Sequence, residues 1–209
     1  MADEFHKPVK FPSRVFEVFQ GGKDPAESLR VAHETAHALL SRVRGNPDPD
    51  VVARLVRYTD EHGIDAIAEL WAPALPKTLP GALWRIYLVR VLIRQNPTET
   101  SFLFQRGVDV TTTIDPVIAG AQLPTGPAEI IELADQILRG AFEGDFADAL
   151  ERAAAFCRIE AAGCASIADD VDPSAPERAT ELTTRASRFA KTGDELGACA
   201  RLWRADSLE

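Results

Sequence analysis

The residues of this chain whose types and spacing define a specific chemistry are His33, Glu34 and His37, which match the pattern H-E-x-x-H. On a helix, this spacing places two imidazoles one turn apart on the same side, where both can bind zinc. The glutamate beside the first histidine can then act as the general base of a zinc-dependent hydrolase. The pattern therefore indicates a candidate metal site with His33 and His37 as ligands and Glu34 as the catalytic base.

A catalytic zinc ion needs a third protein ligand, and the sequence around the motif does not provide one. The longer form of the motif has glycine and a third histidine downstream, but Leu40 and Val43 stand at those positions. Glu61, in the next predicted helix, is the remaining candidate for the third ligand. Peptidases of this class also hold their substrate along a β-sheet, and no sheet is predicted before the motif. The zinc-dependent hydrolase is therefore the alternative interpretation, and the preferred one assigns no catalytic residue, metal or cofactor.

The motif is predicted to lie on a helix over 24–44, with Asp24 as its N-cap. Apolar residues recur there at helical spacing and form one stripe, made by Leu29, Ala32, Ala36, Leu39, Leu40 and Val43. At about 100° per residue, His33 falls at the edge of the stripe, and Glu34 and His37 turn further toward the opposite side. The three side chains can share a surface, but any amphipathic helix distributes its polar residues in this way.

Helical periodicity continues along most of the chain. Further helices are predicted over 48–62, 65–71, 80–96, 98–107, 127–139, 146–162, 174–192 and 194–203. Gly163 and Gly193 follow periodic stretches and are interpreted as breaks between helices. The expected fold class is all-α, with about nine helices and no sheet. We expect an irregular, orthogonal bundle that can divide into two helical lobes; a short superhelix of helix pairs is the second choice.

The helix over 80–96 is apolar on nearly every side and is expected to be the buried central helix. Its arginines, Arg85, Arg90 and Arg94, are expected to leave the core at its margins or to pair with acidic residues of neighbouring helices. Two tryptophans, Trp71 and Trp84, flank a proline-rich connection and are interpreted as core anchors. This part of the chain is therefore expected to organise the core.

The segment over 108–126 combines β-branched residues, prolines and glycines without helical period. It is predicted to be an extended crossing or linker and is the best candidate for a lobe boundary. Residues 24–209 are otherwise expected to form a single all-helical domain. The signals over 1–23 fit a strand or a short helix equally, so the structure of this N-terminal segment is left open.

Composition narrows the class of protein. With 45% hydrophobic and 26% charged residues, the chain has the composition of a soluble globular domain. Its formal net charge of -9 opposes binding to nucleic acid, because phosphates would be repelled. The longest apolar stretch, Ala82 to Ile93, contains two arginines and is too short for a membrane span. We therefore expect neither nucleic acid nor membrane as a partner.

The N-terminus and the cysteines bear on location. Met1 to Lys10 lacks the basic start, apolar core and cleavage site of a signal peptide. Three cysteines, Cys157, Cys164 and Cys199, form no C-x-x-C pair and are expected to be buried free thiols. Both observations favour a cytoplasmic location.

Three stretches carry a resemblance to a known family: 60–71 (DEHGIDAIAELW), 79–85 (LPGALWR) and 144–147 (GDFA). Over most of its length the chain resembles an uncharacterised, entirely helical family of small proteins from high-GC Gram-positive bacteria. The resemblance implies an all-helical fold without an established activity. It also implies that His37 is not shared with the family, in which case the H-E-x-x-H match is incidental.

The amphipathic helices, the acidic charge and the incomplete catalytic set together favour a non-enzymatic protein that acts through a protein partner or by forming a homo-oligomer. Binding of a small apolar ligand between helices is a third class, without a residue that points to it.

Overall fold

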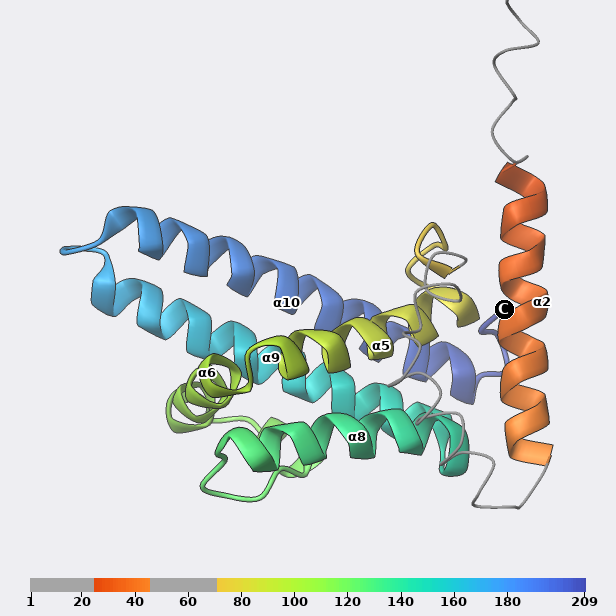
Figure 1. Ribbon diagram of the computed structural model, residues 1–209, viewed down its shortest axis with the longest axis horizontal. Coiled ribbons are helices and arrows are strands. Elements are labelled where there is room, and N and C mark those ends of the chain that lie inside the picture. The colour runs from red at the N-terminus through yellow and green to blue at the C-terminus, as the bar shows by residue number, and fades with distance from the viewer. Residues whose placement is uncertain (1–24, 46–70) are drawn as a thin grey trace, which may run out of the picture.

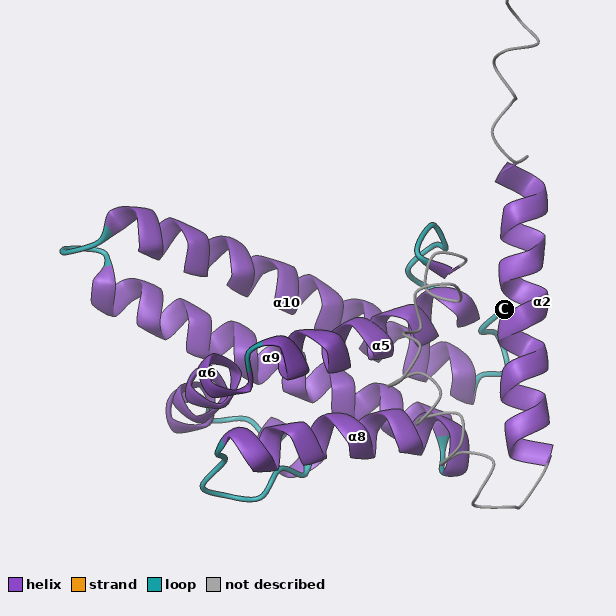
Figure 2. Ribbon diagram, in the orientation of Figure 1, coloured by secondary structure: helices purple, strands orange, loops and turns teal. Residues whose placement is uncertain are grey.

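The computed structural model describes residues 25–45 and 71–209, and all regular structure in these ranges is helical (Figure 2). The elements are α2 (Pro25–Gly45), α5 (Leu79–Gln95), α6 (Pro97–Val110), α7 (Asp115–Ala119), α8 (Pro127–Glu143), α9 (Phe146–Val171) and α10 (Pro176–Arg204). The all-α class is thus confirmed, and the described ranges contain seven helices, fewer than the nine predicted over the whole chain. The predicted helix over 48–62, all but the last residue of the helix predicted over 65–71, and the segment 1–23 lie outside the described residues.

Side chains that precede the helices fix several of their starting points. The Thr78 hydroxyl accepts a hydrogen bond from the amide of Gly81 at the start of α5 (3.3 Å), and Asp145 accepts one from the amide of Ala147 at the start of α9 (2.7 Å). Asn96 caps α6 in the same way by accepting a hydrogen bond from the amide of Glu99, so this helix begins at Pro97 and not at the predicted residue 98. A capping side chain thus sets where each of these helices begins, although sequence patterns locate the cap only to within a residue or two.

Two glycines lie inside helices where the sequence pattern predicts helix ends. Gly163 and Gly193 were expected to end helices, yet α9 and α10 run through them, so the two helices predicted over 174–203 are one. Gly163 lies inside a helix because the backbones of α6 and α9 pack closely against each other at this position. A Cβ atom on Gly163 would lie 1.9 Å from the carbonyl oxygen of Leu103, and one on Gly107 would lie 2.0 Å from that of Ile159. These glycines let α6 cross α9 with no side chain between them.

The stretch expected to be extended, 108–126, contains helical turns. Residues 108–110 complete α6, and α7 follows and packs against α9. Asp115 in the first turn of α7 forms an ion pair with Arg158 of α9 at 2.6 Å. Gly120 then ends α7 in a left-handed conformation (φ 74°), which glycine adopts without strain. The prediction of an extended segment is wrong for these turns.

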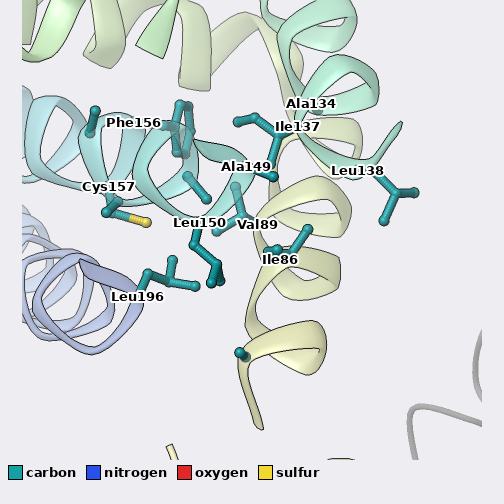
Figure 3. Packing of buried hydrophobic residues seen from close by; sticks show 14 of the residues in the cluster. Ile86, Val89, Ala134, Ile137, Leu138, Ala149, Leu150, Phe156, Cys157 and Leu196 are labelled. Carbon is teal, nitrogen blue, oxygen red and sulfur yellow. The ribbon is translucent and has the colours of Figure 1, made fainter. Parts of the chain in front are cut away.

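The most enclosed helix among the described elements is α9, whereas α5 was expected to take this place. α9 packs against α5, α6, α7, α8 and α10, and it forms a long antiparallel pair with α10 (Figure 1). Figure 3 shows the core where these helices meet, with Ile86 of α5, Ile137 of α8, Leu150 of α9 and Leu196 of α10. By contrast, α5 leaves Leu92 45% exposed. α5 therefore lies between the core and the surface.

The expected pairing of the α5 arginines is confirmed. Arg85 binds Glu195 of α10 (2.6 Å), and Arg90 binds Asp135 of α8 (2.9 Å). Arg94 also approaches Asp135 (3.6 Å). These pairs tie α5 to two neighbouring helices at the margins of its apolar face.

The cysteines are also as expected: Cys157, Cys164 and Cys199 are buried and free. Burial raises the pKa of Cys164 to about 12 and that of Cys199 to about 11, so these thiols stay protonated at neutral pH. Among the described helices, none combines the length and apolar character that crossing a membrane requires.

Candidate functional site

The H-E-x-x-H turn lies on α2, at one edge of the described structure, where the helix packs against α5 and α8 (Figure 1). The apolar stripe of α2 is buried at Ala32, Ala36 and Leu40. The motif lies beside that stripe. His33 is half-buried, whereas Glu34 and His37 are exposed.

Glu34 and Thr35 of this turn form polar contacts. Arg30 forms an exposed ion pair with Glu34 at 2.7 Å, which occupies the residue that a zinc hydrolase would use as its base. Thr35 accepts a hydrogen bond from the indole N–H of Trp71 at 3.2 Å, and its own hydroxyl lies 2.8 Å from the carbonyl oxygen of Val31. Thr35, a variable position of the motif, thus fastens α2 to Trp71, which is buried as expected.

The zinc hypothesis depends on a third ligand. Within residues 25–45 and 71–209, no group of three His, Cys, Asp or Glu side chains is placed to hold a metal ion. The candidate third ligand, Glu61, lies outside those ranges. The structure therefore places His33 and His37 on successive turns of one helix and adds no third ligand from the residues it describes. The site stays a prediction.

A second candidate site, which has no sequence motif, lies between α5 and α10. We call it the α5–α10 groove. It is half-open, with a volume of about 810 Å³. Its apolar lining consists of Ala72, Trp84, Leu88, Val89, Leu92 and Phe189. Trp84 was expected to be a core anchor, but it is only half-buried and lines this groove. The volume falls within the range of ligand sites in proteins, roughly 300–1,000 Å³.

Ion pairs mark the two ends of the groove. At one end, Arg85 of α5 binds Glu195 of α10. At the other, Glu99 of α6 binds Arg178 (2.5 Å) and Arg185 (3.0 Å) of α10. Although burial raises it, the hydrogen bonds from the two arginines leave the pKa of Glu99 below its ordinary value. α5 runs from the Arg85–Glu195 end of the groove toward the Glu99 end, whereas α10 runs from Arg185 at the Glu99 end toward Glu195. The two helices are therefore antiparallel.

The groove is connected to the core through aromatic rings. The Arg185 guanidinium lies over the ring of Phe189, 5.6 Å from its centroid, which allows a cation–π contact. Phe189 in turn meets Phe156 of α9 edge to face at 6.2 Å, and Phe156 stacks on Phe104 of α6 at 5.7 Å. The groove wall is therefore held in place by the packed interior.

Behind Arg185 lies a buried carboxyl group. Glu160 of α9 is fully buried, and its nearer oxygen is 3.9 Å from the Arg185 guanidinium. Neither of its oxygens has a hydrogen-bond partner, and the same is true of the buried Thr100 hydroxyl of α6. Burial raises the pKa of Glu160 to about 8, so the group is mostly protonated at neutral pH. Buried carboxyl groups without hydrogen bonds are rare and mark a special environment.

Neither the groove nor Glu160 is predicted by a motif in the sequence. The groove combines residues 84–99 with residues 180–192, and no local pattern signals that these stretches meet. Glu160 did leave a signal, because it lies four residues after Phe156 and four before Cys164, within the apolar stripe of a helix. An acidic residue in that position predicts a buried carboxyl group.

No known protein family, no curated protein and no solved structure matches the chain.

Proposed function

We propose that the protein is a non-enzymatic binding protein whose α5–α10 groove holds a protein partner, either a different chain or a second copy of itself. The observation that carries this proposal is a concave surface on which Trp84, Leu88 and Leu92 are accessible side by side. A large exposed apolar patch in a concave setting with a polar rim is characteristic of interaction sites.

The state of the polar groups supports binding over catalysis. Arg85 and Arg185 are engaged with Glu195 and Glu99, at distances of 2.6 and 3.0 Å. Such pairs hold the rim of the groove in a fixed shape, which suits recognition, because a preformed site loses less conformational entropy on binding.

We also propose the finer features expected from the sequence: an irregular bundle, a single domain over 24–209 and a cytoplasmic location. The buried free thiols support a reducing compartment. Membership of the helical family from high-GC Gram-positive bacteria is proposed on the three resembling stretches.

The proposal is tested by cross-linking from inside the groove. A photoreactive phenylalanine analogue replaces Leu92, and a matched control carries it at Phe102, which is 58% exposed on α6 and does not line the groove. Irradiation in the cells that normally make the protein should give a discrete adduct from position 92 and none from position 102. The same adduct from both positions, or a cross-link confined to a single chain, would contradict the proposal.

The captured protein is then purified and titrated against the unmodified chain and against Leu92→Glu. Because Leu92 is exposed, the variant should fold normally, as thermal unfolding followed by circular dichroism can verify. We expect the Kd to rise at least tenfold, which corresponds to about 1.4 kcal/mol. An unchanged Kd would remove the groove from the interaction. If the captured protein is the chain itself, light scattering of wild type and variant gives the same comparison.

A further inference from the structure

The α5–α10 groove has a defined length. On α10, Arg185 and Glu195 take part in the ion pairs at its two ends and lie ten positions apart in the sequence. Ten residues of helix span about 15 Å. This length equals nearly three turns of a second helix lying along the groove.

The apolar lining follows helical spacing. Trp84, Leu88 and Leu92 lie four residues apart on α5 and therefore form a straight row along that helix. Rows of this kind interlock with the side chains of a neighbouring helix, whose anchors recur at three- and four-residue intervals. A small ligand would instead favour a site that encloses most of its surface, and the groove is half-open.

The charges of the groove leave one cation without a counter-charge. Arg85 is balanced by Glu195, and Arg178 and Arg185 are balanced by Glu99 and Glu181. Glu160 is mostly neutral at pH 7, because burial raises its pKa to about 8. Arg188 lines the groove on the exposed side of α10 and has no acidic partner among the residues that the structure describes.

We propose that the α5–α10 groove binds an amphipathic helix of a partner protein, and that this helix carries a carboxylate beside its apolar anchors, paired with Arg188. The proposal rests on the proposed function of the groove and adds the chemistry of the occupant. Although the chain is acidic overall, charges on exposed surfaces are screened beyond about 8 Å at physiological salt. The carboxylate therefore responds mainly to Arg188.

The test is a selection from a displayed library of 16-residue amphipathic helices, with apolar residues at i, i+4 and i+8 and random residues elsewhere. The full chain and its Arg188→Glu variant serve as separate targets. We expect Asp or Glu to be enriched at one fixed position with the first target, and Lys or Arg at the same position with the second. The selected acidic peptides, measured by fluorescence anisotropy, should bind Arg188→Glu at least tenfold more weakly.

A charge reversal on the same helix is the control. Arg201→Glu lies 13 residues from Arg188, about 20 Å along α10, and is exposed outside the groove. It should leave peptide affinity within twofold. An equal effect of both reversals, or peptides without a fixed acidic position, would overturn the pairing with Arg188 while leaving the groove as a binding site.

Two further outcomes address the occupant. Peptides that bind Leu92→Glu as tightly as the unmodified chain would contradict both this inference and the proposed function. Complete displacement of the peptides by decanoate at submillimolar concentration would assign the groove to small apolar carboxylates and overturn the helix. Retention of the peptides in the presence of decanoate supports it.

Discussion

The turn on α2 and the groove between α5 and α10 differ in how their residues come together. His33, Glu34 and His37 are close in sequence and form a known pattern, but Glu34 pairs with Arg30 and His37 faces solvent. The groove has no motif, yet it collects side chains about 100 residues apart around a fixed concave surface. A functional site needs convergence of groups in space, and a spacing match on one helix supplies only part of it.

The groove depends on the α6–α9 crossing that supports it, and disturbing that crossing should have the largest effect. In Gly163→Ala, the new Cβ would lie 1.9 Å from the Leu103 carbonyl oxygen, which is backbone and cannot move aside. We expect the free energy of unfolding to fall by about 3 kcal/mol. Urea denaturation measures this change, and groove ligands should bind more weakly because Glu99 moves with α6.

The matched control is Gly197→Ala on α10, where the nearest atom to a new Cβ is the flexible end of Arg201 at 3.7 Å. It should be neutral or stabilise the protein by up to about 1 kcal/mol, since alanine favours helix. Equal responses of the two variants would mean that α6 and α9 do not meet through their backbones.

The buried carboxyl group behind the groove should make stability depend on pH. In the unfolded chain Glu160 has a pKa near 4.5, and in the folded protein it is about 8. Between these values the unfolded state binds fewer protons, so the free energy of unfolding falls as pH rises. We expect a decrease of roughly 3 kcal/mol between pH 5 and pH 8, because one proton contributes at most about 1.4 kcal/mol per pH unit and this slope falls off near each of the two pKa values.

Glu160→Gln should remove this part of the pH dependence. The groups around the carboxyl are Arg185, which favours its charged form, and Glu99, which opposes it. Glu132→Gln, an exposed change on α8, is the control and should leave the profile unaltered. A profile that is identical in the wild type and Glu160→Gln would show that the carboxyl group is accessible to water.

On α2, the variable position of the motif should matter more to stability than its second histidine. Thr35→Val removes the acceptor of the Trp71 indole N–H and should cost about 1 kcal/mol. His37→Ala, at an exposed position, should change stability by less than about 0.5 kcal/mol. Thermal unfolding of both variants checks this order. A greater loss of stability in His37→Ala than in Thr35→Val would show that His37 makes a stabilising contact and contradict this prediction.

Metal content sharpens the comparison further, with the smallest expected effect. Protein purified without a nickel column should contain less than about a tenth of an equivalent of zinc. A tight structural or catalytic zinc site would retain about one equivalent through purification. Mass spectrometry of the metal content measures this directly. One equivalent of zinc that is lost in both His33→Ala and His37→Ala would restore the zinc-dependent hydrolase as the leading hypothesis.

Periodicity in the sequence predicted the all-α class and the positions of α2, α5 and α8, because an apolar stripe identifies a helix from local information alone. It could not distinguish a glycine that ends a helix from one that permits a crossing. Gly163 permits α6 to approach, and that neighbour lies some 60 residues earlier in the sequence. Sequence alone also does not show which helices pack around which. For this reason the apolar α5, and not the alanine-rich α9, was expected to be the central helix.

The candidate sites follow the same rule. His33, Glu34 and His37 could be selected from sequence because their relation is local. Arg188, Phe189 and Leu92 could not, because their relation exists only once α5 and α10 are antiparallel neighbours. Glu160 lies between these cases, since its place in an apolar stripe predicts burial but does not identify Arg185 as its neighbour.

The central place of α9 has a consequence for amide exchange. The middle of α9 is buried against neighbouring helices, so amide hydrogens there should exchange mainly when those helices separate. Exchange rates along the middle of α9 should then report the opening of the whole molecule, whereas those of α2 should report a local event. Deuterium uptake in the middle of α9 would therefore report the rate of global unfolding. A ligand that binds the groove of the folded protein should slow this uptake.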